Sequence, residues 1–151
     1  MQIGGTAAAE RRARALYLVA ALALWFHGDA AARASAAAPA GDAERGAALF
    51  ARLPCASCHD ITRPSPGGEI CPNLGSIGVE AGRRVAAAAY HGKAKDAAGY
   101  IRESIVDPNA FIVPGPNYRT ADGQSVMPKT FAAMLSASEL DDLVAYLLTR
   151  R

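Results

Sequence analysis

The stretch Cys55-Ala56-Ser57-Cys58-His59 places two thiols three positions apart and an imidazole directly after the second thiol. This pattern, C-x-x-C-H, is typical of covalent attachment of a c-type haem. Haem carries two vinyl groups on neighbouring pyrroles, and two thiols at this spacing can each add to one of them. His59 would then lie beneath the ring, where a neutral imidazole nitrogen can bind the iron. The pentapeptide therefore predicts both a tether and an axial ligand.

Three other interpretations of the two thiols remain open. A thioredoxin-like redox pair needs a βαβ context, and no strand-rich pattern precedes Cys55. A zinc site needs a second set of ligands, whereas the only other cysteine is Cys71. A plain disulfide between Cys55 and Cys58 leaves His59 without a role. Haem attachment gives a role to all three side chains of the motif.

The beginning of the chain differs from the remainder. Three arginines within 11–14 precede a 12-residue apolar run over 15–26, and an alanine-rich stretch follows. These features are typical of a secretory signal peptide, so we predict one over 1–40, cleaved between 34 and 40, and a single mature domain over 41–151. An uncleaved membrane anchor is the alternative, although this apolar run is shorter than the ~20 residues that span a bilayer.

Charge does not favour a nucleic-acid partner. The chain has 16 basic and 14 acidic residues, and removing the four basic and two acidic residues of the predicted leader leaves 12 of each. The net charge of +2 thus belongs to the leader, and the mature domain is neutral before any haem propionates are counted. A neutral domain lacks the net positive charge that attracts nucleic acid. Docking to a protein partner must therefore rest on a local charged patch or on apolar contact.

The last stretch of the chain gives the clearest helix signal. Ser136 and Glu139 have the spacing of a capping box, in which the hydroxyl and the carboxylate bind free backbone donors at a helix start. Apolar residues then recur at helical spacing, namely Leu140, Leu143, Val144, Leu147 and Leu148. We predict an amphipathic helix over 137–149.

Two further helices are expected in the mature domain. An apolar stripe over 97–105 runs into Asp107-Pro108, where the residue before proline disfavours helix. A short helix over 42–52 has Asp42 and Glu44 near its positive end. No strand alternation longer than a few residues is present, so the predicted class is all-α.

Residues 41–151 resemble a class I cytochrome c domain, with the pieces in the family's order. Gly46 and Phe50 resemble the first helix of the family, in which a glycine permits close crossing of the last helix and an aromatic ring packs at the contact. The remaining resemblances are the haem motif, Cys55 to His59; the aromatic-leucine pair of the last helix, Tyr146-Leu147; the loop after the motif, Pro72-Asn73-Leu74; and the methionine loop, Met127-Pro128.

The resemblance implies the cytochrome c fold, with three to five helices and long loops around one covalently bound haem c. It also implies Met127 as the sixth iron ligand, because the family places a methionine opposite the histidine and a thioether favours ferrous iron. The other side chains available after the motif are Met134, His91, Lys93 and Lys95. We expect Met134 to face apolar neighbours as a gap-filler, and His91 to be a surface histidine in a solvated loop.

Supporting roles follow from the same resemblance. The carbonyl of Pro72 would accept a hydrogen bond from His59 and orient its ring, although a simple turn proline is an equal alternative. Arg83 or Arg84 could pair with a haem propionate, or could be ordinary surface arginines. The loop before Met127 would wall the distal side of the ring with Phe111, Ile112, Val113 and Tyr118, residues that core packing alone would also select.

Cys71 departs from the family pattern, which has glycine before the proline of the loop after the haem motif. Glycine permits close approach to the ring, so Cys71 either shifts the loop or fills a gap as a small hydrophobe. A free thiol in an exported protein could also pair with a partner. We favour packing.

The expected function is electron transfer without catalysis. We predict a periplasmic, monomeric one-electron carrier that contacts its redox donor and acceptor proteins transiently. One alternative is a haem c electron-entry subunit of a periplasmic dehydrogenase or membrane-bound respiratory complex. Another is a haem enzyme or gas sensor, which would need an open distal position in place of Met127.

Overall fold

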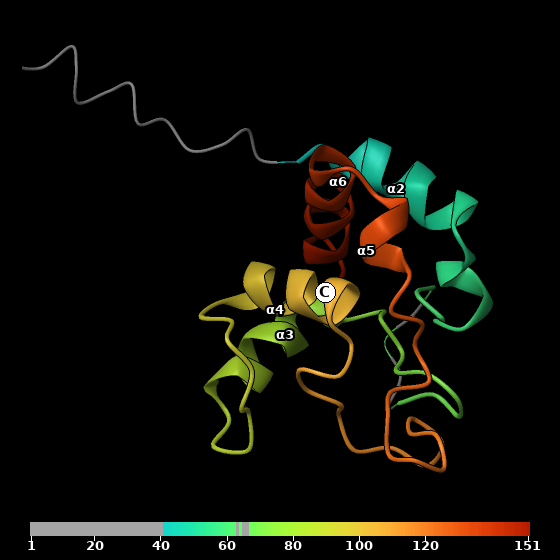
Figure 1. Ribbon diagram of the computed structural model, residues 1–151. Coiled ribbons are helices and arrows are strands. Elements are labelled where there is room, and N and C mark those ends of the chain that lie inside the picture. Colours follow the sequence, from blue (N-terminus) through green and yellow to red (C-terminus); the bar gives the residue numbers. More distant parts are fainter. Residues whose placement is uncertain (1–40, 63, 65–66) are drawn as a thin grey trace, which may run out of the picture. The chain divides into compact units, whose positions relative to one another are not determined.

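The computed structural model describes residues 41–62, 64 and 67–151 (Figure 1). The predicted signal peptide over 1–40 lies outside the described residues. Within the described part, no helix is long and apolar enough to cross a membrane. The described elements are α2 (Ala43–Arg52), the 3₁₀ helix η2 (Pro54–Ser57), α3 (Ile77–Ala86), α4 (Ala97–Val106), α5 (Phe131–Met134) and α6 (Ala137–Leu148). Among them β structure is limited to one isolated bridge, between Arg119 and Ser125. The all-α prediction is confirmed.

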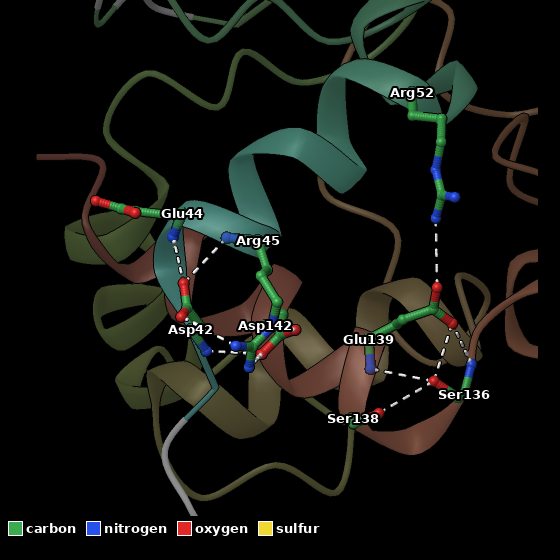
Figure 2. Close-up of polar contacts among 8 residues, drawn as sticks. All are labelled: Asp42, Glu44, Arg45, Arg52, Ser136, Ser138, Glu139 and Asp142. Atoms are coloured by element: carbon green, nitrogen blue, oxygen red, sulfur yellow. Dashed lines mark hydrogen bonds and ion pairs between the residues drawn. The ribbon is translucent and has the colours of Figure 1, made fainter.

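All three helices expected from the sequence are present with nearly the expected ends. α6 carries the capping box, because Ser136 accepts a hydrogen bond from the Glu139 N–H and the Glu139 carboxylate accepts one from the Ser136 N–H (Figure 2). α4 is capped by Asp96 and ends one residue before Asp107. In α2, Asp42 is the N-cap and accepts from two backbone N–H groups of the first turn.

Two helices and the 3₁₀ turn were not predicted. α3 contains Gly78 and Gly82, and glycine weakens the helix signal of a sequence. Gly78 is required by packing, since an added Cβ would lie within 3.0 Å of the carbonyl oxygens of Leu148 and Arg150. The Gly78 N–H donates to that Arg150 oxygen at 2.9 Å. α5 spans four residues, too few to produce a period.

α2 and α6 cross closely beside one another (Figure 1). Gly46 permits this crossing, because an added Cβ would fall within 3.0 Å of the Asp142 carbonyl group and of the Tyr146 Cβ. Four residues on, the rings of Phe50 and Tyr146 pack with centroids 5.8 Å apart. The predicted roles of Gly46, Phe50 and Tyr146 at a helix crossing therefore agree with the structure.

A buried carboxylate joins the same two helices (Figure 2). Asp142 is only 4% exposed and accepts a hydrogen bond from the Asp42 N–H at 2.6 Å. Its oxygens also accept from Arg45, from Nε at 2.8 Å and from Nη2 at 3.0 Å. The fork of the guanidinium and one backbone donor thus compensate the burial of the charge. Hydrogen bonding by Arg45 lowers the pKa of Asp142 below its ordinary value.

We expect the Asp142 carboxylate to make stability depend on acid pH. Because its pKa is lower in the folded chain, the ionised group stabilises the fold above its unfolded pKa, and this contribution is lost as pH falls through the folded pKa. Asp142→Asn should flatten the dependence of the free energy of unfolding on pH below about 4. Urea unfolding at several pH values measures this. Asp107→Asn at the exposed end of α4 is the control, and an equal change in both variants would contradict the assignment.

The core lies where α2, α3, α4 and α6 meet. Its buried members are Leu49, Phe50, Ile77, Ala81, Tyr100, Ile101, Leu143, Val144 and Leu147. The long segments 58–76 and 107–130 connect these helices and carry the loop residues predicted to surround a haem. The helical scaffold therefore holds two loops whose side chains can face one another.

Candidate haem-binding site

The C-x-x-C-H motif begins directly after α2. Leu53 ends that helix and precedes Pro54, which starts η2. The Cys55 carbonyl oxygen accepts hydrogen bonds from the Cys58 N–H at 3.2 Å and from the His59 N–H at 3.0 Å. This single turn brings the two thiols and the imidazole close together in space, as attachment to one planar group requires.

His59 is oriented by the loop that follows it. Its Nδ1 lies 2.7 Å from the carbonyl oxygen of Pro72. A carbonyl can only accept, so Nδ1 carries the proton and the lone pair of the neutral ring is on Nε2. Burial lowers the pKa of His59, and the bond to Pro72 opposes this shift in part. A second bond, from the Leu74 N–H to the Asp60 oxygen at 2.8 Å, holds the loop in place.

His59 and Met127 line the same cavity, which is partly open to solvent. Its wall is predominantly apolar and draws on α3, α4, α6 and both long loops. Pro72 and Cys71 contribute from the first loop, and the second contributes all four residues expected on the distal side: Phe111, Ile112, Val113 and Tyr118. His59 and Met127 also line a smaller neighbouring cavity together with Cys55.

Met127 follows a loop over 118–126 that folds back on itself. The Val126 N–H donates to the Tyr118 oxygen at 3.2 Å, and the Thr120 N–H donates to the Gln124 oxygen at 2.8 Å. The buried Tyr118 hydroxyl bonds to both the N–H and the carbonyl oxygen of Gly68, at 2.9 and 2.8 Å. This residue, predicted only as a wall, therefore also ties the second loop to the first.

The donor set fits a haem. An imidazole with a free Nε2 and a thioether side chain line one apolar cavity. Cys55 lies one turn before the imidazole and Cys58 directly before it. These are the side chains that tether and ligate a c-type haem. Among the described residues, no three His, Cys, Asp or Glu side chains form a group that could hold a metal ion directly.

Comparison with known families agrees with this geometry. The sequence model of the family described as Cytochrome c matches residues 43–151. The chain belongs to the cytochrome c family. The match is consistent with a class I c-type cytochrome, and the helical architecture is consistent with the cytochrome c fold. No curated protein and no solved structure matches the chain significantly.

Membership of the cytochrome c family has direct functional consequences. It implies binding of haem c and haem-based electron transfer. The family consists mostly of electron carriers rather than enzymes.

The structure separates the two arginines predicted near a propionate. Arg84 lines the cavity, its Nη1 lies 3.4 Å from the Tyr100 hydroxyl, and its guanidinium lies 5.9 Å from the centre of that ring. Arg83 is exposed on the same helix and forms an ion pair with Glu80. Of the two, only Arg84 is therefore within reach of the cavity, and its role toward a propionate stays a prediction.

The other ligand candidates lie away from the cavity. His91 is exposed, as predicted for a surface histidine, and its ring packs against Phe111 at 5.3 Å. Lys93 and Lys95 are exposed as well. The prediction that Met134 faces apolar neighbours is wrong, because Met134 is 54% exposed. The helix α5 is a single short turn, and it buries Phe131 instead.

Cys71 is buried and lines the cavity. Its burial, together with the neighbouring Cys58 thiol, raises its pKa to about 11. Burial also raises the pKa of Cys55, whereas Cys58 is exposed. At neutral pH Cys71 is thus a protonated, apolar thiol, and its position matches that of a small hydrophobe.

Two residues that support Met127, Ser125 and Asn109, are not indicated by any local sequence pattern. The Met127 N–H donates to Ser125 Oγ at 3.1 Å, and the Ser125 N–H donates to Asn109 Oδ1 at 2.8 Å. Asn109 follows Asp107-Pro108, and an asparagine there signals a turn. Its partner is 16 residues further along the chain, a separation that no local pattern reveals.

Proposed function

We propose that the protein is a periplasmic one-electron carrier with a single haem c, attached through Cys55 and Cys58 and ligated by His59 and Met127. The observation that supports this most strongly is that His59 and Met127 line one apolar cavity. When bound, the haem supplies an iron that alternates between its ferric and ferrous states.

The chain's own residues would hold the group in place and exclude water from it. Pro72 fixes the proton of His59 on Nδ1 and leaves Nε2 for the metal. The Met127 thioether would be the second protein ligand of the iron, and its weak donor character would favour the reduced state. The apolar wall keeps the environment of the iron similar in both states, so little rearrangement accompanies electron transfer.

Three polar side chains at the cavity support a carrier rather than a catalyst. His59 is bonded to Pro72, the Tyr118 hydroxyl to Gly68, and Arg84 contacts Tyr100. Each of these groups is thus engaged in positioning a loop or a neighbouring side chain. With Met127 on the iron, no coordination position is open for a substrate.

We assign the carrier to the periplasm because of the leader predicted over 1–40. The balanced charge of residues 41–151 favours transient docking to a redox donor and a redox acceptor through a local surface. A carrier that shuttles between two partners is expected to be a monomer. A carrier of this kind should run as a monomer in gel filtration and should not co-purify with a catalytic subunit.

The Met127 ligand is tested with carbon monoxide. The reduced wild-type holoprotein should resist carbon monoxide, because both axial positions are filled by protein side chains. Met127→Ala should bind it readily, with a shift of the main haem absorption band. Met134→Ala, which changes an exposed methionine, is the matched control and should behave as the wild type does. Ready binding by the wild type would refute the carrier assignment and favour a haem enzyme or sensor.

A further inference from the structure

The 118–126 loop is fixed to the rest of the domain at two points. At one, the Tyr118 hydroxyl bonds to Gly68 in the loop after the haem motif. At the other, the side chain of Asn109 accepts the hydrogen bond of the Ser125 N–H. Ser125 is also the residue whose hydroxyl accepts from the Met127 N–H. Ser125 therefore links Asn109 to the backbone of Met127 through two consecutive hydrogen bonds.

Asn109 itself is held rigidly. It lies in a turn just after α4, closed by the bond from the Ala110 N–H to the Asp107 oxygen at 2.9 Å. Its preceding residue, Pro108, is buried and lines the cavity. The orientation of the side-chain amide is settled by its partner, since only Oδ1 can accept from an N–H. The turn that follows α4 thus provides the acceptor that holds the Ser125 end of the 118–126 loop.

The geometry points to a role for Asn109 as a positioning residue for Met127, acting through Ser125. This inference rests on the proposed ligation of iron by Met127. A thioether is a weak ligand for iron. The position of the Met127 backbone therefore decides whether its side chain stays bound to the iron when a competing ligand is present. Neither Asn109 nor Ser125 lines the cavity, so both would act only through the backbone that they hold.

A second observation concerns the remaining atom of the same amide. Asn109 Nδ2 is buried without a hydrogen-bond partner among the described residues. A buried donor left unpaired is destabilising. An asparagine retained in spite of this cost is consistent with a need for its acceptor, Oδ1.

The experiment measures how readily imidazole displaces Met127 from the ferric holoprotein. We expect Asn109→Ala and Ser125→Ala to bind imidazole about tenfold more tightly than the wild type, equivalent to about 1.4 kcal/mol. Both should also weaken the visible charge-transfer band of a thioether bound to ferric haem. Asn117→Ala, the same substitution at an exposed site nine residues before Val126, is the matched control.

The outcomes separate this inference from the proposed function. If Met127→Ala leaves imidazole affinity unchanged, Met127 is not the ligand and the proposed function fails. If Met127→Ala raises the affinity but Asn109→Ala and Ser125→Ala do not, only the positioning role fails. Thermal unfolding of each variant is recorded as well, since a purely structural residue would lower the melting temperature without changing imidazole affinity.

Discussion

Gly46→Ala is expected to destabilise the protein by about 3 kcal/mol, the upper part of the range for overpacking. The added Cβ would fall within 3.0 Å of the Asp142 carbonyl carbon and oxygen and of the Tyr146 Cβ. A side chain could turn away, but a helix backbone cannot, so α2 must move off α6. That movement would also loosen the Arg45–Asp142 pair and the contact of Phe50 with Tyr146.

Gly82→Ala is the matched control for this effect. Gly82 lies within α3, and an added Cβ would meet nothing within 4 Å. The same substitution there should stabilise the protein by roughly 0.5–1 kcal/mol, because alanine loses less conformational freedom in a helix than glycine does. Urea unfolding of the two holoprotein variants gives both values. Similar free energies of unfolding for the two variants would show that the crossing is not tightly packed at Gly46.

His59→Ala should abolish the low-spin absorption spectrum of the holoprotein. Substituting a residue that hydrogen-bonds to a metal ligand lowers metal affinity about 10- to 100-fold, and removing the ligand itself should lower it further. Cys55 and Cys58 remain in this variant, so the haem should stay attached to the chain on a denaturing gel. Absorption spectra and haem staining of the same samples separate loss of ligation from loss of attachment.

His91→Ala provides the comparison for His59. His91 is exposed and its ring contacts Phe111 from outside the cavity. Its substitution should leave the low-spin spectrum unchanged. A spectrum altered equally by both substitutions, or by His91→Ala alone, would contradict His59 as the proximal ligand.

The parts of the fold that could be predicted are those encoded within a few residues. The capping box of Ser136 and Glu139 and the proline after Asp107 set the ends of α6 and α4 to within one residue. The motif places Cys55, Cys58 and His59 in one turn by spacing alone. The α2/α6 crossing was anticipated from the resemblance, which supplied the pairing of Gly46 with the last helix.

The parts that could not be predicted depend on distant partners. α3 is helical although Gly78 weakens its propensity, because the backbone of Leu148 and Arg150 packs against that glycine. Arg83 and Arg84 are adjacent in sequence, and only the rotation of α3 against the core decides which one reaches the cavity. Met134 was misplaced for a similar reason, since a helix of one turn can bury only the residue that faces inward.

The hydrogen bond between Asp42 and Asp142 joins residues 100 positions apart. His59, Cys71, Tyr118 and Met127 all lie within the segment that this contact closes into a ring. Loop-closure entropy rises only slowly with length, as the logarithm of the number of residues, so a ring of this size costs little more than one half as long. The crossing of the first and last described helices can therefore confine both ligand-bearing loops at once. Order in both loops thus depends on a contact that neither of them makes, and we expect unfolding of the helix crossing and loss of iron ligation by Met127 to occur together.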